Sequence, residues 1–309
     1  VLPDGAIEVW GNPSGEDDLD LRGFLTGSEG TVAIATSIGV RLLPIPESVE
    51  TFLASYPSMQ SACETVSEIV AEGLAPVALE VMDNLAIQAV EDSTFRAGLP
   101  REAGAVLLVE IEGSELKTQE ESISIEALLK KRDPIECRRA ESEQERKLLW
   151  KARKGAGGAL GRLGPDTYVM DGVVPRSKLA EVMAFVEDIQ KDVDLPVANL
   201  FHAGDGNIHP HFSYDARDPA QVRAVEEAGA KILRRCLELG GSLTGEHGIG
   251  LEKEHLLSEQ FDSDSLALME RLRQAFNPAD LLNPGKGLPL RRSCAEAFHR
   301  HGGVAGGPQ

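Results

Sequence analysis

Residues 201–212 read FHAGDGNIHPHF and place three of the chain's seven histidines around one tight turn. The Gly-Asp-Gly-Asn stretch at 204–207 is typical of a four-residue β-hairpin loop. Such a loop puts His202 opposite His209, and cross-strand partners share a face with Cβ atoms about 4.5–5.5 Å apart. His211 lies one step further along the same face, because side chains alternate along a strand. The stretch therefore predicts an antiparallel hairpin that carries three imidazoles on one face.

The segments around this hairpin mix strand-like and helical patterns. Alternating or continuous apolar residues indicate strands, and apolar residues at steps of three and four indicate helices. Strands are predicted at 31–43, 48–56, 76–83, 105–113 and 167–175, and helices at 58–73, 142–163, 177–193 and 218–239. This mixture predicts an α+β fold, with mixed or antiparallel sheets and packed helices, rather than a doubly wound parallel sheet.

A proline-punctuated break, LPIPES at 43–48, predicts the first domain boundary. We expect one part at 1–45, a second at 46–288, and a disordered glycine-rich tail at 289–309. The first residues, VLPDGAIEVW, lack the basic and apolar regions of a signal peptide and contain no Met, which favours an internal start.

The composition excludes several classes of function. The 309 residues carry 31 basic and 50 acidic side chains, a net charge of −19, which argues against nucleic acid and against an anionic membrane surface as partners. No apolar run approaches the roughly 18 residues that span a bilayer. The four cysteines are Cys63, Cys137, Cys236 and Cys294. They are too widely spaced to form a CxxC metal or redox pair, and this pattern is typical of a protein in a reducing compartment.

A single arginine interrupts the apolar face of one predicted helix. Ser142 and Glu145 have the spacing of a capping box at its start. The apolar stripe that follows has Arg153 where a leucine would be expected, and a buried arginine is costly without an anion. Either Arg153 forms a buried ion pair with a carboxylate of this chain, or it captures the carboxylate of a substrate.

A second cluster, Glu246 and His247 in TGEHGIG, puts a carboxylate and an imidazole side by side in a glycine-rich loop. Two histidines and a carboxylate are a common set of ligands for a divalent metal, and they leave a position open for substrate. The hairpin histidines and Glu246 are therefore candidate ligands, with His247 available as a base. The alternative is a polar hairpin whose histidines are only hydrogen-bonded.

Three motifs in this order carry a resemblance: HAGDGNIHP at 202–210, TGEHGIG at 244–250 and FNPADLLNPGK at 276–286. They resemble the C-terminal domain of the FAD-linked oxidases of the vanillyl-alcohol-oxidase superfamily. DLRGFLTGSEGTVAIAT at 20–36 is similar to the last segment of the FAD-binding domain of that superfamily. The resemblance is closest to the FAD subunit of glycolate oxidase, with D-lactate and D-2-hydroxyglutarate dehydrogenases nearby. It implies that 1–45 ends an FAD-binding domain, that 46–288 is the substrate-binding cap domain, and that the chain is a fragment lacking most of the FAD-binding domain.

The resemblance also implies roles for single residues. His202, His209 and Glu246 match metal ligands of the family, His247 matches the proposed base, and Arg153 matches the arginine that binds the substrate carboxylate. The positions that match the flavin-facing segments are Ser28, Glu29, Gly30, Thr31, Ile34 and Asn283. One position departs from relatives with larger substrates, because Val169 stands where they have a lysine. Without that cation, a small monocarboxylate is favoured over a dicarboxylate.

The implied activity is the FAD-dependent oxidation of a small 2-hydroxy acid, glycolate or D-lactate, to the 2-oxo acid, with a divalent ion such as zinc, manganese or iron. A fragment of this kind is expected to bind FAD poorly and to be inactive alone. The family further implies a flavin-type and an iron–sulfur partner subunit, and a cytoplasmic location, peripheral to the inner membrane through those subunits. Two other functions stay open: a metal-dependent hydrolase using the same ligands, and a non-catalytic fragment that docks partner subunits.

Overall fold

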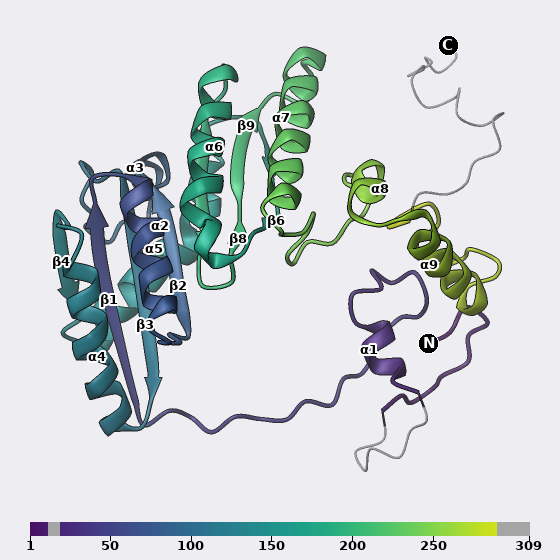
Figure 1. Cartoon of the computed structure of the whole chain (residues 1–309), viewed down its shortest axis with the longest axis horizontal. Helices are drawn as coiled ribbons and strands as arrows, with labels where there is room; N and C mark the ends of the chain where they lie inside the picture. The colour runs from purple at the N-terminus through teal and green to yellow at the C-terminus, as the bar shows by residue number, and fades with distance from the viewer. Residues whose placement is uncertain (12–18, 289–309) are drawn as a thin grey trace. The chain divides into compact units, whose positions relative to one another are not determined.

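The computed structural model describes residues 1–11 and 19–288 of the chain (Figure 1). Its contacts divide the chain into two compact units. The sheet unit is Val40–His247, and the terminal unit is Val1–Gly39 together with the residues from Gly248 onward. The predicted domain limits at 1–45 and 46–288 stay predictions, and the predicted tail at 289–309 lies outside the described residues.

A nine-stranded sheet forms the centre of the sheet unit. Seven strands follow one another in the order β4 (Glu136–Arg139), β1 (Ser48–Tyr56), β3 (Ala105–Gly113), β2 (Ala78–Asp83), β7 (Val197–His202), β8 (Asn207–Ile208) and β6 (Gly172–Val173). Off this path, β9 (Pro210–Tyr214) pairs with both β7 and β5 (Asp166–Val169). Every pairing found between these strands is antiparallel, which confirms the predicted α+β class.

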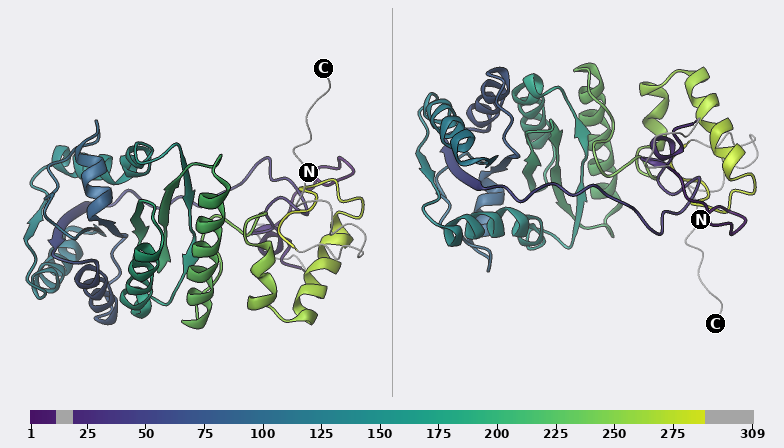
Figure 2. Two further views of the ribbon diagram at one scale, coloured as in Figure 1. Left: turned by 90° about the horizontal axis from the view of Figure 1, so that it is seen from above. Right: turned by 90° about the horizontal axis from the view of Figure 1, so that it is seen from below.

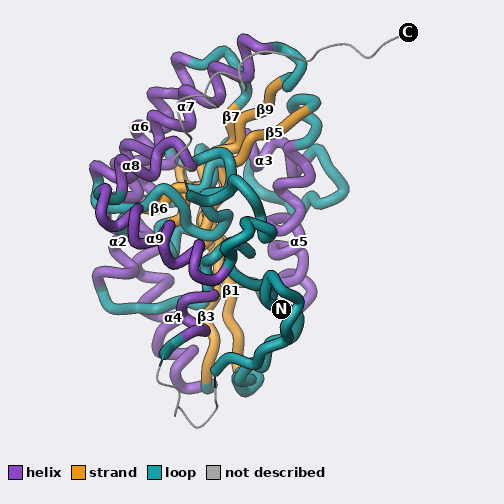
Figure 3. The backbone as a smooth tube through the Cα atoms, turned by 90° about the vertical axis from the view of Figure 1, so that its right-hand side faces the viewer, coloured by secondary structure: helices purple, strands orange, loops and turns teal. Residues whose placement is uncertain are grey.

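Helices lie on both sides of these strands. Figure 3 shows α3 (Asn84–Glu91) and α5 (Glu143–Leu160) on one side of the orange strands. The other side carries α2 (Met59–Ala71), α4 (Glu115–Lys130), α6 (Leu179–Asp192), which follows the short η1 (Arg176–Lys178), and α7 (Pro219–Glu238). Because both faces of the sheet are covered, a polar side chain on a central strand must find its partner inside the protein.

Each central strand supplies side chains to two cores. Leu53 and Leu108 are cross-strand partners and pack with the helices α3 and α5. Their neighbours Phe52 and Val109 are also partners and fully buried, and alternation sends them to the opposite face. The nearly continuous apolar sequences of β1 and β3 thus reflect burial on both faces rather than a half-exposed strand.

The helices predicted at 58–73, 142–163 and 218–239 are present, and each begins at a side-chain cap. Ser58, Ser142 and Asp218 are N-caps, and their side chains accept backbone N–H groups of the first turn. In α5 the Glu145 carboxylate accepts the amide of Glu141 at 2.9 Å rather than that of Ser142, which is a variation on the predicted capping box. Gly240, at φ +83°, follows the C-cap of α7 in the left-handed conformation that favours glycine.

The strand predicted at 31–43 is wrong. This segment is extended, but it forms no strand among the described residues. Its apolar side chains are largely solvent-exposed, with Ile38 at 75% and Leu42 at 84%. Alternation predicts a strand only where a neighbouring strand completes the ladder. The backbone of Ile34 exchanges hydrogen bonds with Val1 alone, so no ladder forms.

The terminal unit is held by aromatic packing around one helix. It contains α1 (Leu21–Leu25), the short η2 (Glu254–Leu256), α8 (Leu257–Gln260) and α9 (Ser263–Phe276). The rings of Phe24 and Trp10 pack on Phe276 with centroids 4.9 and 5.9 Å away. Both views in Figure 2 show the purple N-terminal segment beside the yellow-green helices α8 and α9. Among the described residues no helix is both long and apolar enough to cross a bilayer.

The described cysteines are free thiols, and Cys294 lies outside the described residues. Cys63 and Cys236 are buried in the sheet unit, whereas Cys137 is half-buried. Burial raises the pKa of the Cys63 thiol far above its ordinary value, which keeps it protonated and unreactive.

Candidate functional site

The histidine hairpin forms, but its register differs from the predicted one. His202 pairs with Asn207, so the loop is 203–206 and His209 is not opposite His202. Asn207 belongs to the strand because its buried amide donates to Asp171 and is held there at 3.0 Å. A shift of two residues keeps every side chain on its predicted face. The rings of His202 and His209 accordingly meet edge to face, with centroids 5.5 Å apart.

Each of these two histidines uses its Nδ1 atom on a fixed acceptor. His202 Nδ1 lies 2.8 Å from the Glu80 carboxylate, and His209 Nδ1 lies 2.9 Å from the carbonyl oxygen of Met170. Both acceptors require a proton on Nδ1, which leaves the lone pair on Nε2. The two Nε2 atoms lie 3.8 and 3.1 Å from the same carboxylate oxygen of Glu246. The structure therefore brings the three predicted metal ligands together with their donor atoms facing one another.

The donor atoms of this group fit a divalent metal ion. The ligating atoms of His202, His209 and Glu246 all lie within 4.8 Å of one another. Ligands about 2.0–2.2 Å from a shared ion are separated by roughly 3–4 Å. His209 Nε2 is moreover buried without a hydrogen-bond partner, an orphaned atom that a metal ion would satisfy. Two nitrogens and one carboxylate oxygen leave further positions open, as in metal sites that also bind substrate.

A second group that could hold a metal, Asp171, His209 and His247, fits less well. The carboxylate of Asp171 is fully buried and already accepts the amides of Gly245, Glu246 and His247 at 3.0–3.1 Å. These bonds tie the loop of Glu246 and His247 to the strand end that carries Asp171. This role of Asp171 was not predicted from the sequence, although an aspartate inside the otherwise apolar VMDGVV stretch was the available signal.

His247 is placed beside the group but remains open to solvent. Its ring stacks on that of His209, with centroids 5.0 Å apart and planes 18° apart. Its Nε2 lies 3.5 Å from the Glu246 carboxylate, and 45% of its side chain is exposed. An accessible imidazole next to the ligand atoms can exchange a proton with a bound molecule, so the predicted role as a base is compatible with this position.

Arg153 lies on the buried face of α5, as predicted, and it has an anionic partner. Its Nε and Nη2 atoms lie 2.9 and 2.7 Å from one oxygen of Glu80. The other oxygen of Glu80 accepts His202. The buried ion pair considered for Arg153 is thus present, and its acid comes from β2, which the sequence did not identify. Whether Arg153 also binds a substrate carboxylate stays a prediction.

The environments of the three hairpin histidines differ. The hydrogen bond to the Glu80 carboxylate raises the pKa of His202. Desolvation lowers the pKa of His209, and burial lowers that of His211 to about 4. Burial thus favours the neutral form of both His209 and His211, which is the form of imidazole that binds metals.

The predicted flavin-facing segment, 28–31, lies in the terminal unit. Glu29 has a positive φ of +53°, and its carboxylate accepts the amides of Ile249 and Gly250 at 2.7 and 2.8 Å. The side-chain amide of Asn283 donates to the Glu29 carbonyl. Glu29 and Asn283 therefore hold each other, whereas the Ile34 side chain is half-exposed and apart from this network. The assignment of this segment to a flavin stays a prediction.

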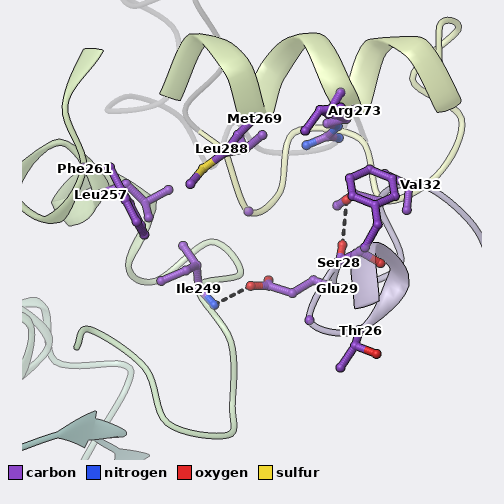
Figure 4. A pocket seen from close by; sticks show the side chains of 15 residues that line it. Thr26, Ser28, Glu29, Val32, Ile249, Leu257, Phe261, Met269, Arg273 and Leu288 are labelled. Atoms are coloured by element: carbon purple, nitrogen blue, oxygen red, sulfur yellow. Dashed lines mark hydrogen bonds between the residues drawn. The ribbon is translucent and has the colours of Figure 1, made fainter. Parts of the chain in front are cut away.

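A cavity of about 340 Å³ lies beside this segment in the terminal unit. Figure 4 shows Ile249, Leu257, Phe261, Met269 and Leu288 around it, with the hydrogen bond from Ile249 to Glu29 at its edge. Its walls are mainly apolar. This part of the unit can thus take up an apolar group next to the predicted flavin segment.

Comparison with known families and proteins identifies relatives. A family model described as "FAD linked oxidases, C-terminal domain" matches residues 45–287. The chain is 44% identical over 296 residues to the glycolate oxidase subunit GlcD of Escherichia coli (strain K12). That alignment covers 94% of this chain and 59% of the relative. This chain is also 34% identical to a probable mitochondrial D-lactate dehydrogenase of Danio rerio, in an alignment that covers 90% of this chain and 56% of the relative. The chain thus spans less than two thirds of the length of these relatives.

Solved structures share the fold. A crystal structure of p-cresol methylhydroxylase with substrate bound superposes with a TM-score of 0.67 at 13% identity. The match covers 92% of this chain and 62% of the other. At this low identity the likeness concerns the fold alone, and it agrees with the α+β architecture.

Proposed function

Since this chain belongs to the FAD-linked oxidase family by its C-terminal domain, we propose that it supplies the substrate- and metal-binding part of an FAD-dependent 2-hydroxy-acid oxidase. The substrate is a small monocarboxylate, glycolate or D-lactate, and the product is the 2-oxo acid. The observation that carries the proposal is the convergence of two histidine Nε2 lone pairs and the Glu246 carboxylate within 4.8 Å. The names of the relatives, glycolate oxidase subunit and D-lactate dehydrogenase, support the substrate class.

The residues of this chain would bind and deprotonate the substrate. His202, His209 and Glu246 hold a divalent ion of zinc, manganese or iron. Arg153 binds the substrate carboxylate, and His247 takes the proton of the 2-hydroxyl group. A metal held there would supply a Lewis acid that lowers the pKa of that hydroxyl, and a bound flavin would supply the acceptor for the C2 hydride. Val169 adds no second cation, which favours a substrate with one carboxylate.

In this proposal the terminal unit would hold the flavin through backbone contacts. The contacting residues are Ser28, Glu29, Gly30, Thr31, Ile34 and Asn283. Support comes from the positive φ of Gly30, +67°, and from Asn283 Nδ2, which lies 3.0 Å from where a Cβ on Gly30 would be. A side chain at this position would be strained and crowded, so the backbone stays bare on this side.

Partner subunits and location follow from the same relationship. The Escherichia coli relative is a glycolate oxidase subunit, which supports assembly with further chains. We propose a flavin-type and an iron–sulfur partner, and a cytoplasmic enzyme peripheral to the inner membrane through them.

The proposal is tested by metal content. Plasma mass spectrometry of the purified chain should find about one divalent ion, which is lost in a His202→Ala, His209→Ala double variant. His255→Ala, at an exposed position of η2, is the matched control and should keep the ion. Equal metal content in all three proteins would remove the metal from the proposal. Ester hydrolysis by the metal-loaded chain without flavin would instead favour a metal-dependent hydrolase, and absence of metal and of glycolate binding would favour a docking fragment.

A further inference from the structure

We propose that Glu80 is a positioning residue that connects substrate binding to metal binding. Its carboxylate holds the arginine assigned to the substrate and one histidine assigned to the metal. This inference rests on the proposed function, because it concerns the same site. It adds a residue from β2 that lies outside the three sequence motifs.

The position of Glu80 in the sheet creates the link. Glu80 lies on β2 directly opposite His202 on β7, and it is only 8% exposed. Cross-strand partners share a face, and on this face α5 presents Arg153. A carboxylate at this point can therefore reach both side chains, and burial favours these contacts because a largely desolvated carboxylate is costly without donors from the protein.

The two carboxylate oxygens have separate tasks. Oε1 accepts Nδ1 of His202 at 2.8 Å. Oε2 accepts both Nε and Nη2 of Arg153, at 2.9 and 2.7 Å. One oxygen thus serves the histidine and the other serves the arginine, so neither contact can be lost without leaving an acceptor unpaired.

For His202 the consequence is a fixed tautomer. A proton held on Nδ1 by the carboxylate leaves the Nε2 lone pair toward Glu246, 3.8 Å away. A carboxylate on the far nitrogen also makes the imidazole a stronger ligand, and loss of such a partner typically lowers metal affinity 10- to 100-fold.

For Arg153 the consequence is a guanidinium that is anchored along one edge. Nε and Nη2 are engaged, and among the described residues no hydrogen bond of Nη1 is found. One edge can thus still receive a carboxylate while the other keeps the group in place. The anchor also balances the buried positive charge, which would otherwise be costly.

The chain contains a matched control for this carboxylate. Glu110 on β3 is 6% exposed and is also paired with an arginine of α5, Arg146. Its other partners are Thr51 and Trp150, and it touches no histidine. Replacing Glu110 thus perturbs a buried acid of the same sheet without touching the site.

The test compares Glu80→Gln, Glu80→Asp and Glu110→Gln in the full chain. An amide has one acceptor oxygen instead of two, so the side chain of the Glu80→Gln variant cannot serve both partners. We expect Glu80→Gln to weaken Zn²⁺ binding in calorimetry 10- to 100-fold, and to weaken glycolate binding at saturating Zn²⁺. Glu80→Asp should recover part of both losses, and Glu110→Gln should change neither affinity. The inference is overturned if either affinity of Glu80→Gln stays within about twofold of the original chain, a difference below about 0.5 kcal/mol.

A measurement on the unaltered chain keeps the inference testable even if Glu80→Gln does not fold. Nitrogen NMR of labelled histidines in the metal-free protein, at a pH high enough for the His202 imidazole to be neutral, should show His202 protonated on Nδ1 and bare on Nε2. The opposite tautomer would contradict the role of Glu80. Failure of the unaltered chain to bind Zn²⁺ would instead contradict the proposed function, so the two failures are distinguishable.

Discussion

Two buried glutamates on the same face of the sheet pair with arginines of the same helix, yet they end in different arrangements. Glu110 receives Arg146 as a fork, with Nε on one oxygen and Nη2 on the other, at 2.8 and 2.9 Å. Glu80 receives both nitrogens of Arg153 on a single oxygen and gives its second oxygen to His202. Among the described residues, the pair of Glu110 and Arg146 contacts none of the candidate metal site. The pair of Glu80 and Arg153 contacts the candidate metal ligand His202.

The difference shows how a buried charge can be either structural or connected to function. Glu110 also accepts Thr51 and Trp150, at 2.7 and 2.6 Å, so its acceptor positions are filled by side chains of the scaffold. Glu80, in contrast, holds the proton of His202 on Nδ1, which leaves the Nε2 lone pair facing Glu246. A buried ion pair by itself is weak support for function, and the identity of the third partner decides between the two roles.

Removing the arginines should give the largest effects. Arg153→Ala should lower the free energy of unfolding by about 3–5 kcal/mol, because it leaves Glu80 buried with His202 as its remaining partner. Arg146→Ala should cost less, because Thr51 and Trp150 still donate to Glu110 and the Arg146 side chain is 28% exposed. Urea unfolding of both variants measures the difference. An equal loss in the two variants would mean that the two pairs are energetically alike.

A smaller loss of stability should follow from Trp150→Phe. This change removes the indole donor to Glu110 and should cost about 1.5–3 kcal/mol, the value of a hydrogen bond to a charged group. Zn²⁺ affinity should not change, because the Glu110 pair has no contact with the metal ligands. A drop in Zn²⁺ affinity of about tenfold or more, roughly 1.4 kcal/mol, would show that the Glu110 and Glu80 pairs are coupled through α5, and the comparison between them would fail.

The smallest effect concerns acid stability. Burial alone would raise the pKa of Glu110, but the hydrogen bonds from Arg146, Thr51 and Trp150 outweigh it and lower the pKa below its ordinary value. A lowered pKa stabilises the fold above the unfolded-state value of about 4.3, and this stability is lost as the pH falls further. Glu110→Gln should therefore flatten the decline of the urea midpoint between about pH 5 and pH 3. An unchanged decline would locate acid sensitivity in other carboxylates.

The comparison also shows which contacts a sequence can predict. Local periodicity and capping predicted the α+β class, the N-cap Ser142, and the strands at 48–56, 76–83 and 105–113. Each of these depends on neighbours a few residues away, so the pattern is visible along the chain. The face shared by the hairpin histidines was also predictable, because it survives a register shift of two residues.

Predictions that needed a distant partner were less successful. The segment at 31–43 has the alternation of a strand but no neighbouring strand among the described residues. The hairpin register was wrong because the buried amide of Asn207 is fixed by Asp171, 36 residues earlier in the chain. In the part of the chain that the structure describes, segment 31–43 lacks the inter-strand hydrogen bonds of a ladder, and Asn207 has a hydrogen bond to Asp171. Local periodicity detects neither, because both depend on residues far away in the chain.

The sequence by itself determined the strands at 48–56, 76–83 and 105–113, the buried face that carries Arg153, and the motifs that identify the family. Only the tertiary structure decided that Glu80 joins Arg153 to His202 and that Asp171 holds the amides of Glu246 and His247. The sequence contains 50 acidic residues that could pair with these groups, and nothing local distinguishes among them. Burial determines which acidic residues pair with these groups, because a carboxylate removed from water must accept hydrogen bonds from the donors that the fold brings within reach.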